Sequence, residues 1–135
     1  MLSLSMIVRN EEARLGACLA SVSALADEMV VVDTGSTDAT IAIAEAAGAR
    51  VERIDWPGDF APARNRALEF LKGDWVLVLD ADEQLRPEVI PSLRALMAQP
   101  VVLVINQLRK ELGAAMAPYS RVSRLFRRHP AIRWR

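Results

Sequence analysis

Short apolar runs alternate with amphipathic stretches along most of this 135-residue chain. The apolar runs predict strands, because a strand that is buried on both faces needs no polar alternation. In chain order, strands are expected over residues 2–8, 29–32, 50–54, 75–79 and 101–105, with a short final strand over 122–126. Helical patterns separate them, so the order indicates one α/β domain spanning 1–135, with right-handed crossovers and a mostly parallel sheet.

Apolar residues that recur three and four positions apart predict the helices. The stripe of the first helix consists of Leu15, Cys18, Leu19, Val22 and Leu25. Because Cys18 lies on that stripe, it is expected to be a core thiol rather than a reactive one. The second helix is expected to end near Ala47 and to be capped by a hydroxyl from the turn at 35–38. A loop at 55–62 and a helix over 63–71 follow. Pro87 is expected to open the last helix, whose predicted core face consists of Val89, Ile90, Leu93, Leu96 and Met97.

Composition restricts the classes of protein that fit. Lysine plus arginine and aspartate plus glutamate number 17 each, so no net field attracts nucleic acid, and no nucleic-acid partner is expected. Hydrophobic content of 52% suits a globular core, and no apolar stretch is long enough to span a bilayer. The N-terminus lacks the pattern of a signal peptide, and the single cysteine fits a reducing compartment. Cytoplasmic residence is therefore expected.

Two carboxylates, Asp80 and Asp82, directly follow the apolar run at 75–79. The carboxyl ends of strands are where open α/β sheets bind ligands. If the backbone stays extended, the two side chains point the same way and repel by roughly 3 kcal/mol at about 5 Å and an effective dielectric of 20. A divalent cation shared with a phosphate would relieve that repulsion. The alternative is that Asp80 ends the strand and Asp82 caps the next helix.

Other polar groups also follow predicted strands, and a parallel sheet would bring them to one edge. These groups are Asn10, Glu11, Asp33 and Asp38. They suit the base and ribose of a nucleotide, although Asp33 could simply end its strand and Asp38 could favour the helix dipole. Arg64 opens a predicted helix after a loop, where its guanidinium could meet a phosphate or remain solvated.

Missing patterns exclude several mechanisms. The chain has no G-x-G-x-x-G and no P-loop lysine, so dinucleotide and P-loop cradles are not expected. One histidine, His129, cannot build a multi-histidine zinc centre, and no G-x-S-x-G indicates a serine hydrolase.

The C-terminal stretch is basic, with Arg121, Arg124, Arg127, Arg128, Arg133 and Arg135. It predicts either a solvated face or a site for an anionic acceptor, a donor diphosphate or a phospholipid surface.

Four motifs together resemble the inverting family 2 glycosyltransferases of the GT-A fold. They are MIVRNEE at 6–12, VVDTGSTD at 31–38, ARN at 63–65 and LDADE at 79–83. The tail RLFRRHP at 124–130 is similar to an element of a bacterial branch that includes lipopolysaccharide-core glucosyltransferases and relatives fused to helical repeats. The resemblance implies a GT-A three-layer sandwich, transfer of a sugar from a UDP-sugar, and a Mn²⁺ or Mg²⁺ cofactor.

The resemblance also implies roles for individual residues. The nucleotide-sugar is expected to contact Arg9, Asn10, Glu11, Asp33, Ser36, Arg64, Asn65, Asp80, Ala81 and Asp82. Asp82 is expected to bind the cation directly, with Asp80 near the cation and the ribose. The acceptor would be a saccharide or a lipid-linked group, reached by peripheral contact at the inner face of the membrane.

Two departures from the family's pattern are visible. Thr34 stands where many members carry a second acid. Family catalytic domains are generally longer than this chain, so the general base that inversion needs is expected beyond Arg135. Two alternatives therefore stay open: a nucleotide-sugar binding module without catalysis, and a sugar-phosphate nucleotidyltransferase.

Overall fold

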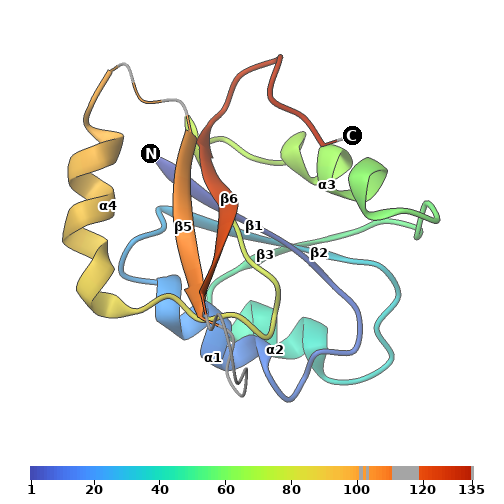
Figure 1. The fold of residues 1–135 in the computed structure, drawn as a ribbon. Helices are drawn as coiled ribbons and strands as arrows, with labels where there is room; N and C mark the ends of the chain where they lie inside the picture. Colours follow the sequence, from blue (N-terminus) through green and yellow to red (C-terminus); the bar gives the residue numbers. More distant parts are fainter. Residues whose placement is uncertain (101, 103, 111–118, 135) are drawn as a thin grey trace.

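The protein is a three-layer α/β sandwich around one six-stranded sheet of order β3-β2-β1-β4-β6-β5 (Figure 1). The structure is a computed structural model that describes residues 1–100, 102, 104–110 and 119–134. Four neighbouring strands are parallel: β3 (Arg50–Arg53), β2 (Glu28–Asp33), β1 (Leu2–Val8) and β4 (Trp75–Val78). Two antiparallel strands extend the sheet beyond β4, namely β6 (Tyr119–Arg127) and β5 (Val104–Lys110). The predicted α/β class and mostly parallel sheet are confirmed.

Helices cover both faces of the sheet because its central strands are apolar on both sides. The helices are α1 (Leu15–Val22), α2 (Thr40–Ala46), α3 (Phe60–Leu68) and α4 (Ile90–Met97), with a 3₁₀ turn η1 (Pro87–Val89) before α4. One core contains Leu4 and Met6 of β1 together with apolar residues of α1, α2 and α4. The opposite core contains Val76 and Val78 of β4 with residues of α3. Figure 1 shows α3 on the opposite side of the sheet from α1 and α2.

The strands mostly lie where the apolar runs predicted them. The last two differ: β5 runs over 104–110 rather than 101–105, and β6 begins at Tyr119 rather than at Val122. Residues 101 and 103 lie outside the described residues. The two strands pair with each other in antiparallel register from Val104↔Phe126 to Lys110↔Tyr119. Pairing between them, rather than apolar content, extends them past the predicted limits.

Two expectations about the second and third helices were wrong. The loop predicted at 55–62 ends earlier, because α3 begins at Phe60 and Pro62 sits in its first turn, where a backbone N–H has no helical partner to lose. The N-cap of α2 is Ala39, and a carboxylate rather than a hydroxyl serves its first turn: Asp38 Oδ1 accepts from the Thr40 N–H at 2.9 Å.

On α4, the predicted core face is only partly correct. Ile90 and Leu93 are buried and Met97 packs against the core. Val89 and Leu96 are 36% and 43% exposed. Val89 belongs to the 3₁₀ turn, whose tighter winding moves it out of phase with the helix. None of the helices that the structure describes combines the length and apolarity of a membrane span.

Candidate functional site

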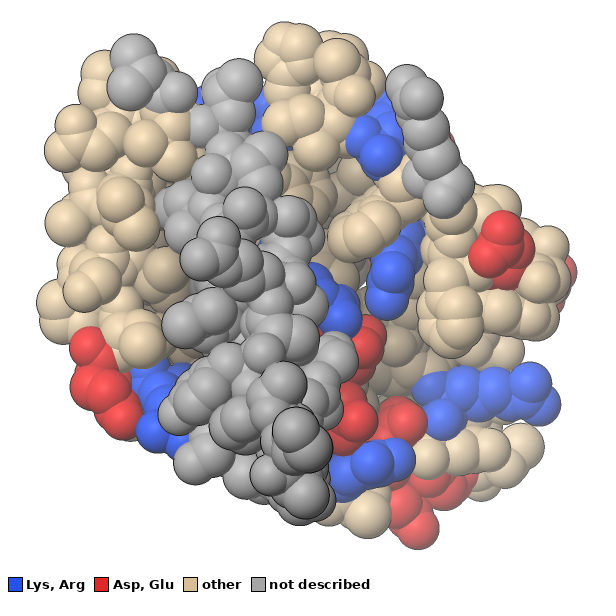
Figure 2. Space-filling model, viewed as in Figure 1, with Lys and Arg blue, Asp and Glu red and all other residues tan. Residues whose placement is uncertain are grey.

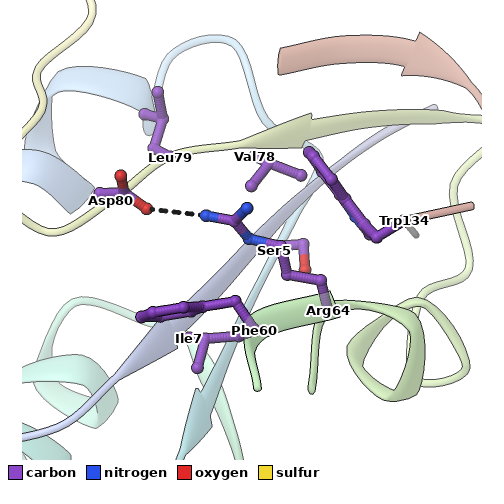
Figure 3. Close-up of a pocket in the computed structure, with 8 residues that line it drawn as sticks. All are labelled: Ser5, Ile7, Phe60, Arg64, Val78, Leu79, Asp80 and Trp134. Carbon is purple, nitrogen blue, oxygen red and sulfur yellow. Dashed lines mark ion pairs between the residues drawn. The ribbon is translucent and has the colours of Figure 1, made fainter. Parts of the chain in front are cut away.

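A pocket opens between the carboxyl ends of β1 and β4, on the side of the sheet that α3 covers (Figure 3). From the carboxyl end of β1 the chain continues through α1 to β2, on one side of β1, whereas from the carboxyl end of β4 it continues to β5 and β6, on the other side of β4. Such a reversal between neighbouring parallel strands leaves a crevice, which is where open α/β sheets bind ligands. The pocket is lined by Ser5, Ile7, Phe60, Arg64, Val78, Leu79, Asp80 and Trp134.

Arg64 is the central charged group of this pocket. Its guanidinium carbon lies 5.5 Å from the ring centre of Phe60 and 4.7 Å from that of Trp134. Its Nη2 lies 3.6 Å from Asp80 Oδ1. Figure 3 shows the side chain reaching from α3 between the two rings toward Asp80. Cation–π contacts of this kind contribute about 0.5–1 kcal/mol each when exposed and more when desolvated. The arrangement presents a planar cation to any anion that enters the pocket.

The acidic pair has a different backbone from the one expected. Strand β4 ends at Val78, and the chain turns at Ala81 and Asp82, with the Glu83 N–H donating to the Asp80 carbonyl at 3.0 Å. The assumption of an extended Asp80–Asp82 segment was therefore wrong, and the alternation of side chains along a strand does not apply to the two carboxylates. Ala81 is buried and Asp82 is exposed. The exposed carboxylate of Asp82 is free to face a ligand in solvent.

Two arginines, Arg64 and Arg124, lie close to the Asp80 carboxylate. Arg124 Nη2 of β6 lies 3.2 Å from Asp80 Oδ2 and 3.7 Å from Glu83 Oε1. Glu83 Oε1 also accepts from the Asp80 N–H at 2.7 Å, which closes the turn. The Arg124 side chain is only 12% exposed, and its Nη1 is buried without a hydrogen-bond partner. Local sequence indicates Arg124 only as part of a basic tail, because its partner Asp80 is 44 residues away in the chain.

Two carboxylates in this turn supply the oxygen ligands that a hard cation prefers. The described residues contain no group of three histidine, cysteine, aspartate or glutamate side chains that could hold a metal ion by themselves. Mg²⁺ commonly uses only one or two protein carboxylates and takes its other ligands from phosphate and water. Asp80 and Asp82 therefore fit a cation that arrives with a diphosphate, and they do not form a closed protein cage.

The loops after β1 and β2 are joined by side-chain hydrogen bonds. Asn10 has φ of 52°, and its Oδ1 accepts from the Thr37 N–H at 2.8 Å. The Asn10 N–H donates to Ser36 Oγ at 2.9 Å. Asp33 is 2% exposed and accepts from the Gly35 and Ser36 N–H groups at 3.0 and 2.9 Å and from the Ser36 hydroxyl. In this structure Asp33, Ser36 and Asn10 shape the rim beside the crevice.

The remaining predicted residues at this edge differ in exposure. Arg9 is exposed, and Glu11 is half-buried with its carboxylate 3.3 Å from Arg14 Nη2. The Glu11 N–H donates to Thr40 Oγ1 at 2.8 Å, which fixes the start of α2 to this loop. The structure thus brings Asn10, Glu11 and Asp33 to the same edge as Asp80. Their contacts with a nucleotide stay predictions.

Asn65, which was predicted to contact the nucleotide-sugar, is bonded to the C-terminal segment in this structure. Its Nδ2 donates to the Trp134 carbonyl at 2.8 Å, and its Oδ1 accepts from the Trp134 N–H at 2.8 Å. The side-chain amide therefore pairs with the backbone of the C-terminal segment. Trp134 and Phe60, which line the pocket, were absent from the predicted set, since nothing in the local sequence of either residue indicates the contact.

The basic tail is not simply a solvated face. Arg127 donates to the carbonyls of Val102 and Gln99 at 3.2 Å each, and its guanidinium carbon lies 4.6 Å from the ring centre of Trp75. Arg128 donates to the carbonyls of Leu71 and Lys72. Figure 2 shows basic and acidic side chains gathered together near the middle of this face. Much of the predicted positive surface is therefore used to hold neighbouring segments.

The thiol of Cys18 belongs to the core, as the apolar stripe predicted. It is fully buried against Met6. Burial, with smaller contributions from the charges of Glu83, Asp80 and Asp82, raises the pKa of the thiol to about 12. The group therefore remains protonated at neutral pH and has no nucleophilic character.

Comparison with known proteins decides the family. The profile of glycosyl transferase family 2 matches residues 3–132. The chain belongs to glycosyl transferase family 2. Its sequence is 52% identical over 132 residues to a TPR repeat-containing protein of Synechococcus elongatus, covering 98% of this chain and 33% of that protein. It is 34% identical over 134 residues to an uncharacterized glycosyltransferase of Rickettsia bellii, covering 93% of this chain and 45% of that one.

Solved structures of other proteins share the fold of this family 2 domain. S. aureus TarS 1–349 aligns with a TM-score of 0.71 at 21% identity, over 93% of this chain and 46% of that chain, a likeness of fold. Glucosyl-3-phosphoglycerate synthase from Mycobacterium tuberculosis, in complex with UDP, aligns with a TM-score of 0.68 at 30% identity, over 82% of this chain and 44% of that chain. Another structure of that synthase contains Mn²⁺, UDP and glucosyl-3-phosphoglycerate. The expected family and GT-A fold are confirmed, and the chain spans less than half the length of these proteins.

Proposed function

We propose that this domain binds a UDP-sugar in the crevice between β1 and β4 and that the whole protein transfers the sugar to an acceptor hydroxyl with inversion. The observation that carries the proposal is the pocket itself: in a family 2 domain, Arg64 and Asp80 meet at the reversal point of the sheet. A planar guanidinium suits a diphosphate, and the carboxylates suit the accompanying cation. The likeness to a UDP-bound synthase supports UDP as the nucleotide.

The proposed donor site uses the residues expected from the family's motifs. Arg64 would approach the diphosphate, and Asn10, Glu11 and Asp33 would lie beside the base and ribose, with Arg9 and Ser36 at the rim. Ala81 is buried, so it would contribute through the backbone of the turn between Asp80 and Asp82. Asp82, which is exposed, would take the Mn²⁺ or Mg²⁺ ion with Asp80 next to it. Such an ion supplies Lewis-acid stabilisation of the departing diphosphate.

Binding by Arg64 and Asp80 requires a rearrangement of charge. In the described structure Asp80 is paired with Arg64 and Arg124. The separation of 3.6 Å between Arg64 and Asp80, with the Asp80 side chain 45% exposed, indicates a weak pair that an incoming diphosphate can replace. The pair therefore keeps Arg64 oriented without holding it tightly.

The test is calorimetric titration of the protein with UDP in the presence and absence of Mn²⁺. We expect metal-dependent binding in the wild type and a loss of the metal dependence in Asp82→Asn. Asp74→Asn is the matched control, since Asp74 is exposed just before β4, at the opposite end of the same strand. Wild-type protein that shows no metal-dependent binding, or an Asp82→Asn variant that binds normally, would falsify the proposal.

One observation favours a second candidate, a nucleotide-sugar binding module without turnover. Among the described residues that line the pocket, Asp80 is the only carboxylate, and its two oxygens face Arg64 and Arg124, which leaves little room for an acceptor hydroxyl within hydrogen-bond distance of either oxygen. Release of free sugar, or transfer to added saccharide acceptors, can be followed by NMR with a UDP-sugar as donor. Turnover would exclude the binding-only alternative, whereas UDP binding without turnover would support it.

A further inference from the structure

The side-chain amide of Asn65 both donates to and accepts from the backbone of Trp134, whose indole contacts Arg64. We infer that Asn65 and Trp134 form a clamp that orients Arg64, so that Asn65 acts on a bound nucleotide through Trp134 and not by touching it. The inference rests on the proposed donor site. It makes Asn65 and Trp134 positioning residues, a role that the family motifs do not assign to them.

The clamp begins with a reciprocal pair of hydrogen bonds. The Asn65 side chain donates to the Trp134 carbonyl and accepts from the Trp134 N–H, both at 2.8 Å. These bonds use the side-chain oxygen and one of the two amide N–H bonds. Little hydrogen-bonding capacity remains for a ligand. The pair attaches a segment that is 69 residues distant in sequence to the middle of α3.

The indole of Trp134 is held on two further sides. Its ring centre lies 6.4 Å from that of Phe126 in an edge-to-face arrangement with an interplanar angle of 79°, and Phe126 is 5% exposed. The Arg64 guanidinium carbon lies 4.7 Å from the indole centre. A buried ring of β6 therefore supports the indole, and the indole in turn supports the arginine. Figure 3 shows Trp134 beside the Arg64 side chain within the pocket.

Without Trp134, little would hold the Arg64 guanidinium in one plane. Its other contacts are Phe60, which is 57% exposed, and Asp80, whose side chain is 45% exposed. Exposed ion pairs fix side-chain geometry weakly, whereas stacking on a ring restricts a guanidinium to the plane in which it can meet a diphosphate. The clamp therefore orients Arg64 before the ligand arrives, which lowers the cost of ordering it on binding.

A double-mutant cycle separates action through Trp134 from direct contact. UDP affinity in the presence of Mn²⁺ is measured by calorimetry for Asn65→Ala, Trp134→Leu and the double variant. We expect each single variant to bind about tenfold more weakly, as is usual for residues that orient a ligand-binding group, and the double variant to be no weaker than the singles. Trp134→Phe keeps an aromatic ring on Arg64 and should recover most of the affinity. Arg66→Ala, on the exposed side of α3, is the matched control and should bind normally.

A measurement without ligand tests the clamp independently. The indole N–H signal of Trp134, identified by its loss in Trp134→Leu, should shift in Asn65→Ala and stay in place in Arg66→Ala. A multiplicative loss of about a hundredfold in the double variant, or Trp134→Phe binding as poorly as Trp134→Leu, would overturn the inference. Wild-type protein that fails to bind UDP overturns the proposed donor site instead. The indole signal then decides whether Asn65 holds Trp134: a shift in Asn65→Ala supports the clamp, and an unchanged signal overturns it.

Discussion

Replacing Gly73 with alanine should destabilise the protein through a clash between the beginnings of β1 and β4. Gly73 precedes β4 and approaches the first residues of β1, where its N–H donates to Ser3 Oγ at 2.8 Å. A Cβ atom at this position would lie 2.5 Å from Ser3 Oγ, 2.8 Å from the Met1 carbonyl oxygen and 2.9 Å from the Ser3 nitrogen. Two of these three atoms are backbone, so rotation of a side chain cannot relieve the overlap.

The magnitude follows from the two interactions that the methyl group would disturb. Overpacking a well-packed site costs about 1–3 kcal/mol. Ser3 Oγ would also have to move, and it donates to Glu28 Oε2 at 2.6 Å besides accepting from Gly73. Losing one such hydrogen bond costs about 1 kcal/mol. The total of about 2–4 kcal/mol corresponds to a fall in Tm of roughly 8–16 °C for a domain of this size.

Gly16→Ala provides a control with the opposite expected sign. Gly16 is exposed in α1, and a Cβ there would lie 3.6 Å from Ile43 Cγ2, an ordinary contact. Alanine in a helix interior is more stable than glycine by about 0.5–1 kcal/mol. Urea and thermal unfolding followed by circular dichroism measure both changes. A Gly73→Ala variant as stable as the wild type, or equal destabilisation by the two substitutions, would refute the reasoning.

Two further predictions concern titration. The pKa of Cys18 is raised to about 12, so little of the thiol is ionised at pH 8. A thiol reagent should therefore modify the native protein at least about a thousandfold more slowly than the urea-unfolded protein. Rapid labelling of the native protein would show that the thiol is not buried. The pKa of Glu28 is lowered overall. Burial by itself would raise this pKa, but the hydrogen bonds from Ser3 and the Lys72 N–H, together with the charge of Arg50, outweigh the effect of burial. A carboxylate whose pKa is lower in the folded state than in the unfolded state stabilises the protein at a pH above the ordinary glutamate pKa. This stabilisation is lost as the pH falls through the pKa of the folded state. Glu28→Gln should therefore lower Tm at pH 7 and flatten its decline below about pH 4.3, and a variant with the wild-type acid profile would contradict this.

Much of the parallel half of the fold was readable from local sequence. The runs 2–8 and 75–79 contain few polar residues, and they became the central strands β1 and β4. Cys18 was placed in the core for the same reason, since one apolar stripe decides which face of a helix is buried. The motifs at 6–12, 31–38, 63–65 and 79–83 were also sufficient for the family, which the match over residues 3–132 confirms.

Contacts across long sequence separations could not be predicted in this way. The extended conformation expected at Asp80–Asp82 was wrong because the Glu83 side chain and N–H close a turn there, and Arg124 of β6 holds that turn from the other side. Asn65 was expected to face the nucleotide, yet its amide pairs with Trp134. Hydrogen-bond capacity that looks free in a motif is often taken by a distant segment.

Periodicity and motif spacing by themselves determined where the strands follow one another along the chain, the buried face of the first helix and the family. Each of these depends on neighbours within a few residues, where apolar spacing sets burial. The tertiary structure alone decided which charges meet: Arg64 with Asp80 and two aromatic rings, and Arg124 with the acidic turn. Charged and aromatic side chains interact according to their distance in space. For residues on different strands and helices, the spacing along the sequence does not determine that distance.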